Sequence, residues 1–154
     1  MRSDGFVAFL TRSLAVLEHE MAVAYRAMCR PLVGRFVRVE ADGEAVTLAF
    51  TRARVDVASD RSPDVEVRTD RDTIVGLVDA EATLLESVLE EKLWLRGAPD
   101  DVLRFHDGLT AYLHGAVRAP SFPHLLSEYR DAPRRDGRVL RPWTPDPDDG
   151  RRQM

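Results

Sequence analysis

Residues 64–78 read DVEVRTDRDTIVGLV, and they decide the fold because the spacing of apolar side chains changes within them. Val65 and Val67 alternate with charged residues, which is the period of two expected for a strand with one buried face. Thr69 followed by Asp72 resembles a helix start, with a capping side chain three residues before an acid. Helical spacing then continues through Ile74, Val75, Leu77 and Val78. We therefore expect a strand that runs directly into a helix.

The period of two extends upstream over residues 33–69 and predicts a block of four strands. Asp42-Gly43 is a typical hairpin turn between the first two of them. The alternating apolar residues then change from even-numbered to odd-numbered positions in the sequence. This change indicates a bulge or tight turn at Thr51-Arg52. Because the connections are short, we expect these strands to form an antiparallel meander.

The sequence predicts helices before and after this strand block along the chain. Apolar residues recur every three or four positions over residues 6–28, which predicts one long helix with Asp4 at its N-cap or in its first turn and Pro31 at its end. Downstream we expect two short apolar helices, a long helix that opens with Pro99 and two acids, and a last short helix. These cover residues 70–78, 84–89, 99–117 and 121–130. Residues 92–97 (KLWLRG) are interpreted as a fifth strand closed by glycine.

Length and composition exclude several classes of protein. A chain of 154 residues that is 44% apolar fits one domain with its own core. A net charge of −4 argues against nucleic acid and anionic membranes, since phosphate binding needs a basic surface. The single cysteine, Cys29, excludes an internal disulfide and a thiolate metal cluster. Arg12 interrupts the first apolar stretch, and no stretch is long enough to span a membrane, so we expect a cytoplasmic protein.

The composition changes after Arg130, where we place the boundary of the folded domain. Residues 1–130 are expected to form the domain, and residues 131–154 a flexible tail rich in Pro, Arg and Asp. Val139, Leu140 and Trp143 are apolar exceptions that could dock into a groove.

Three acidic pairs have the chemistry of general acid–base groups or metal ligands. Two of them lie at predicted helix starts, where capping and the helix dipole already explain them. The third lies at a helix end and is interpreted as a solvated turn. The pairs are Asp70/Asp72, Asp100/Asp101 and Glu90/Glu91.

The histidines and the cysteine also favour structural interpretations. His106 and Asp107 are adjacent on a helix, so their side chains should diverge by about 100°. His114 follows His106 by eight residues, which is not the one-turn spacing of a metal-binding pair. Cys29 lies near a helix C-terminus, where the dipole raises a thiol pKa. We expect no catalytic residue, no metal and no cofactor.

An excess of apolar residues between Thr73 and Leu95 is the most distinctive feature of the chain. Two short, very apolar helices between strands can be ordinary core. They can equally roof a cavity for an apolar ligand. Periodicity alone leaves both interpretations open.

The order of these elements resembles the sterol carrier protein 2 (SCP2) family of lipid-binding domains. Residues 64–77 are similar to the family's strand-into-helix segment. Residues 84–97 resemble its next signature, a short apolar helix followed by a basic–apolar strand that ends in glycine. The resemblance covers roughly residues 5–130. Glu91 departs from it, because family members often have glycine just before that strand.

The resemblance implies an α+β domain with a five-stranded, mostly antiparallel sheet covered by helices and an apolar tunnel between the layers. It also implies binding of a hydrophobic small molecule, such as a sterol, a fatty acid or an acyl-CoA thioester, with transfer to a membrane or presentation to a partner enzyme. The residues expected to line the tunnel are Ile74, Leu77, Leu85, Val88, Leu89, Leu93, Leu95, Phe105 and Leu109.

Two other functions stay open at this point. The same fold could serve as a non-catalytic protein-interaction module whose cavity is filled by its own side chains or by the tail. A cone-shaped isomerase or cyclase of the nuclear-transport-factor-2-like group would also use about 150 residues, and would place an Asp or His inside the pocket. The sequence does not specify the oligomeric state.

Overall fold

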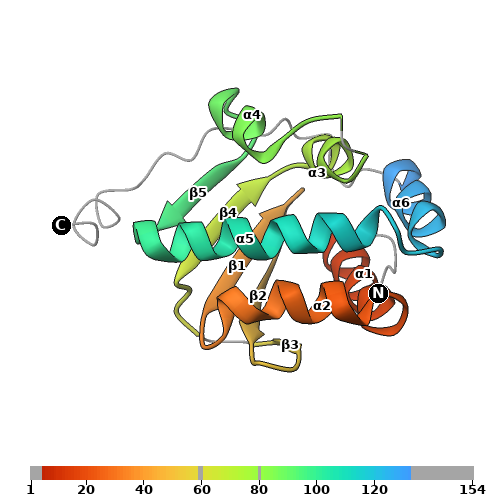
Figure 1. The fold of residues 1–154 in the computed structure, drawn as a ribbon. Coiled ribbons are helices and arrows are strands. Elements are labelled where there is room, and N and C mark those ends of the chain that lie inside the picture. The colour runs from red at the N-terminus through yellow and green to blue at the C-terminus, as the bar shows by residue number, and fades with distance from the viewer. Residues whose placement is uncertain (1–4, 59–60, 80, 133–154) are drawn as a thin grey trace.

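The computed structural model describes residues 5–58, 61–79 and 81–132, which form a sheet with helices packed on one face (Figure 1). The expectations for residues 133–154 lie outside this range. The helices are α1 (Phe6–Glu20), α2 (Ala22–Cys29), the short 3₁₀ helix η1 (Arg30–Leu32), α3 (Arg71–Val78), α4 (Leu84–Leu89), α5 (Pro99–Ala116) and α6 (Phe122–Asp131). The strands are β1 (Phe36–Ala41), β2 (Glu44–Phe50), β3 (Val55–Val57), β4 (Val65–Thr69) and β5 (Trp94–Gly97). The expected α+β class and the five strands are confirmed.

The five strands form one mixed sheet in the order β3-β2-β1-β4-β5. Three neighbouring pairs are antiparallel, while β1 and β4 run parallel, with Val37 opposite Val65. The Asp42-Gly43 turn between β1 and β2 has positive φ angles of 53° and 80°, as a two-residue hairpin requires. The expected turn at Thr51 is also present, since its N–H donates to the carbonyl of Arg54 at 2.9 Å.

The predicted meander is wrong, because the fourth strand does not pair with the third. Instead, hydrogen bonds of Asp64 join the start of β4 to the start of β1. Its N–H donates to the carbonyl of Phe36 at 2.7 Å, and its carboxylate accepts from the N–H of Phe36 at 2.8 Å. The alternation of side chains shows which face of a strand is buried, but not which strand lies beside it.

The two faces of the sheet differ in chemistry. Val37 and Val67 point toward the helices and are buried. Arg38, Glu40 and Arg68 point to the other face, where Glu40 accepts from Arg38 at 3.1 Å and lies 3.5 Å from Arg68. Helices α2 and α5 run across the apolar face (Figure 1). The core therefore lies between this face and the helices.

The expected single N-terminal helix is divided into two. Met21, with φ −133° and ψ 59°, ends α1 and begins α2, although neither proline nor glycine stands at this position. The break lets α2 turn and pack along α5. Gly5 is the N-cap residue of α1, rather than the expected Asp4. Tertiary packing overrides a continuous apolar periodicity here.

Candidate functional site

An apolar cavity of about 120 Å³ lies between the sheet and the helices. Its floor comes from three central strands, and its walls from α1, α3 and α5, with Met28, Leu32 and Leu93 between them. The floor residues are Val37, Val39, Leu48, Phe50, Val67 and Thr69. The cavity therefore occupies the layer in which the resemblance implied a tunnel.

The cavity is least filled by side chains above the middle of the sheet. Val39 lies at the centre of β1, on the face that the helices cover, yet it is only half-buried. Its cross-strand neighbours Val46 and Val67 are buried. Side chains from the helices thus fail to cover the centre of the floor.

Two hydroxyls are the polar side-chain groups on the described cavity wall, and both are already hydrogen-bonded. Thr69 donates to the carbonyl of Lys92 at 2.9 Å. Tyr112 donates to Ser13 Oγ at 2.8 Å, and Ser13 in turn donates to the carbonyl of Leu10. Burial raises the pKa of Tyr112 to about 12, so its phenol stays neutral. The wall therefore offers apolar contact and no charge.

The structure brings five of the nine sequence-predicted residues to the cavity wall. These are Ile74, Leu77, Leu93, Phe105 and Leu109. Val88 and Leu95 pack against the core but do not line the cavity. Leu85 and Leu89 are exposed to 67% and 72%. Helix α4 does not cover the cavity. Leu84 and Val88 lie on the side of the helix that packs against the core, whereas Leu85 and Leu89 point away from it.

The floor and the α1 wall of the cavity are not among the residues that the sequence predicts to line it. Phe6, Phe9, Leu10 and Leu14 of α1 all line the cavity. The sequence does indicate that one face of this helix is apolar and that alternate strand residues point inward. These patterns are equally typical of a filled core, because periodicity does not distinguish a filled core from one that lines a cavity.

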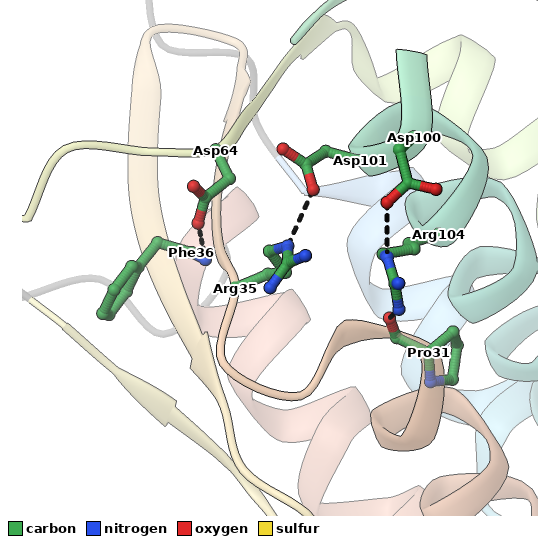
Figure 2. Close-up of polar contacts among 7 residues, drawn as sticks. All are labelled: Pro31, Arg35, Phe36, Asp64, Asp100, Asp101 and Arg104. Atoms are coloured by element: carbon green, nitrogen blue, oxygen red, sulfur yellow. Dashed lines mark hydrogen bonds and ion pairs between the residues drawn. The ribbon is translucent and has the colours of Figure 1, made fainter. Parts of the chain in front are cut away.

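Polar contacts hold the first turn of α5 to the loop before β1 (Figure 2). Asp101 accepts from Arg35 Nε at 2.7 Å, and Asp100 accepts from Arg104 Nε at 3.0 Å. Arg104 also donates to the carbonyl of Pro31 at 3.2 Å. The contacts of Asp101 and Arg104 join α5 to the segment before β1, and Asp100 pairs with Arg104 within the helix, so both acids have structural roles.

The other candidate groups lie away from the cavity. His106 Nδ1 and Asp107 Oδ1 are 3.6 Å apart, so the expectation that these side chains diverge is wrong, but both are exposed. Cys29 is fully buried, and burial raises the pKa of its thiol to about 11. Within the described ranges, no three His, Cys, Asp or Glu residues are grouped to hold a metal. No helix of those ranges has the length and apolarity to cross a membrane.

The architecture matches solved structures of SCP2 domains. The ubiquinone synthesis protein UbiJ-SCP2 aligns with a TM-score of 0.52 at 20% identity, covering 66% of this chain and 82% of its own. SCP2 from Yarrowia lipolytica, in its apo form, aligns at 0.51 and 15%, covering 76% and 97%. A conserved hypothetical protein from Thermus thermophilus, described as possibly a sterol carrier protein, aligns at 0.51 and 14%, covering 75% and 90%. The chain has the SCP2-like fold.

No model of a protein family matches the chain, and no curated protein matches it.

Proposed function

We propose that this protein binds the apolar part of a lipid in the cavity between sheet and helices and leaves any polar end outside. One observation carries the proposal: the cavity wall is apolar, and its two hydroxyls are already paired. A charged group inside would lose its hydration without gaining a partner. An alkyl or ring segment loses nothing there.

The size of the cavity limits what enters without rearrangement. An engineered cavity of about 150 Å³ in another protein, also lined by apolar side chains, stays dry and binds benzene. A cavity of about 120 Å³ is of that order and accepts the end of an unbranched chain. A sterol ring system needs more space. A fatty acid or acyl thioester is therefore the first ligand to test, and a sterol the second.

The experiment is native mass spectrometry of the purified protein, with organic extraction and with offered fatty acids of increasing chain length. Each methylene that leaves water contributes about 0.8 kcal/mol, so affinity should rise about fourfold per added methylene. The increase should stop once the cavity is full. Flat affinities along the series would contradict binding in an apolar cavity.

A pair of variants on α5 tests the location. Leu109→Trp places a large ring at the cavity wall and should abolish most of the binding. Leu103→Trp is the matched control, because Leu103 is on the same helix but 64% exposed and away from the cavity. Equal effects of the two substitutions, or none from Leu109→Trp, would remove the cavity from the proposal.

The second candidate is a protein-interaction module with a self-filled cavity. The small volume favours it, as do the exposed leucines of α4. A clean apo mass and no uptake from the lipid series would select this function.

A further inference from the structure

One side of α4 exposes apolar and acidic side chains together. Leu85 and Leu89 are four residues apart, so they lie on the same side of the helix, and both are mostly exposed. Exposed carboxylates flank them on the helix and on the turns at its ends. We call this set the α4 surface; it consists of Leu85, Leu89, Glu81, Glu86, Glu90 and Glu91.

Neither the core nor the cavity explains this surface. Thr83 and Glu86 form a capping box that fixes the helix start, and Leu84 and Val88 supply its core contacts. Lys92 follows the surface in the chain, and its Nζ lies 3.0 Å from a carboxylate oxygen of Glu90. Its acidic rim disfavours the anionic headgroups of a lipid surface. It suits a basic segment that also carries apolar side chains.

The chain contains such a segment outside the described residues. Residues 134–143 read RRDGRVLRPW, with four arginines against one aspartate. Val139, Leu140 and Trp143 supply the apolar side chains. Arginine pairs well with carboxylates, and a tryptophan ring can cover exposed leucine side chains. The charge and apolarity of this segment complement those of the α4 surface.

The segment starts close enough to reach α4. Arg71, the first residue of α3, donates to the carbonyl of Ala132, so the chain leaves the described domain beside the start of α3. Helix α3 has eight residues and is about 12 Å long. Seven residues beyond Ala132 span up to about 24 Å when extended. Val139 is therefore within reach of α4, which follows α3 in the chain.

We infer that residues 134–143 dock on the α4 surface of the same molecule, with their arginines on its carboxylates and Trp143 against Leu85 and Leu89. The inference goes beyond lipid binding and does not depend on it. The inference is tested by the fluorescence of Trp143, whereas the ligand proposal is tested by the mass of bound lipid. Failure of one is therefore distinguishable from failure of the other.

The test uses the full chain with Trp94→Phe, which leaves Trp143 as the only tryptophan. Its emission should be blue-shifted and poorly quenched by acrylamide. Adding Leu85→Ser and Leu89→Ser should shift the emission to the red and restore quenching. Glu81→Arg with Glu90→Arg should do the same, and so should high salt. The matched control is Leu103→Ser with Val117→Ser and should change nothing, because these exposed apolar residues lie on α5 and directly after its last residue.

Several results would overturn the inference. Emission equal to that of a free peptide of residues 133–154 would show that Trp143 is not docked. If the α4 variants change Trp143 emission no more than the Leu103→Ser/Val117→Ser control does, Trp143 docks elsewhere. If the blue shift of Trp143 emission disappears on dilution, the contact is with a second copy of the chain. Loss of binding to phosphatidylcholine vesicles in the leucine variants, with Trp143 emission unchanged, would assign the α4 surface to lipid. Circular dichroism of each variant checks that the domain is folded.

Discussion

At Gly108 the absence of a side chain lets α5 approach the segment that precedes the sheet. A Cβ atom there would lie 2.6 Å from Leu32 Cδ1 and 3.1 Å from the carbonyl oxygen of Met28. The second atom belongs to the backbone and cannot rotate away. Gly108 also lines the cavity, so the close approach of α5 and the shape of the cavity depend on the same residue.

We expect Gly108→Ala to lower the free energy of unfolding by about 1–3 kcal/mol, because the added methyl group overpacks this contact. The matched control is Gly76→Ala in α3, where the nearest atom to a new Cβ would be 3.8 Å away. That substitution should be neutral or raise stability by up to about 1 kcal/mol, since alanine favours helix more than glycine does. Urea unfolding measures both. A Gly108→Ala protein as stable as the Gly76→Ala protein would contradict the close approach.

At the scale of elements, helix α3 depends on its cap. Asp70 is the N-cap residue, and its carboxylate accepts from the N–H of Thr73 at 2.8 Å. The sequence indicated a helix start at this point but placed the cap one residue earlier, at Thr69. Thr69 instead ends β4 and bonds to Lys92. The helix that follows supplies Ile74, Leu77 and Val78 to the cavity wall.

Asp70→Ala should therefore cost about 1 kcal/mol of stability, as the loss of an N-cap usually does. Asp70→Asn is the control, because asparagine caps about as well and should stay within a few tenths of a kcal/mol. Urea unfolding gives the stabilities, and hydrogen exchange of the first turn of α3 shows where the loss occurs. If the two variants are equally destabilised, the carboxylate acts through its charge and not as a cap.

At the scale of the whole molecule, Arg71 joins three distant parts of the chain. It is only 4% exposed. Its Nε lies 3.5 Å from Asp42 Oδ2 in the β1–β2 turn, and it donates to the carbonyl of Ala132 after α6. Its guanidinium also lies 5.2 Å from the ring centroid of Tyr129, which stacks on Phe9 of α1. Through these contacts Arg71 holds the C-terminal end of α6 next to the β1–β2 turn and the start of α3.

Arg71→Met should lower the free energy of unfolding by about 2–4 kcal/mol, because it leaves a poorly solvated carboxylate and a carbonyl without their partner. Adding Asp42→Asn should recover part of the loss, since asparagine removes the charge and tolerates the positive φ of residue 42. Urea unfolding of both variants, with hydrogen exchange of α6, measures this. A loss below about 1 kcal/mol, or no recovery in the double variant, would show that the ion pair contributes little.

Local patterns predicted the elements well, because each depends on residues close in sequence. The Asp42-Gly43 hairpin, the turn at Thr51, five strands and the short helices α3 and α4 all appear in the structure. The errors that affect the architecture concern relations between elements. The break at Met21 and the pairing of β4 with β1 come from distant contacts.

The cavity illustrates the same division at the level of the site. Its composition followed from the sequence, since apolar residues at strand and helix spacing must face the interior. Leu109 lies on the cavity wall, because its helix spans the core. Leu85 is exposed, because a helix as short as α4 can turn either apolar side to the core, and Leu84 and Val88 face the core instead.

The sequence by itself determined the α+β class, the order of its elements and the apolar chemistry of the interior, since all of these follow from side-chain periodicity and local turn geometry. Only the tertiary structure decided that β4 runs parallel to β1, that α4 turns two leucines outward, and that the core contains a cavity of about 120 Å³. The physical reason is that filled and hollow cores are made of the same apolar residues. What distinguishes them is how closely the helices approach the sheet, and contacts such as those of Gly108 and Arg71 set that distance.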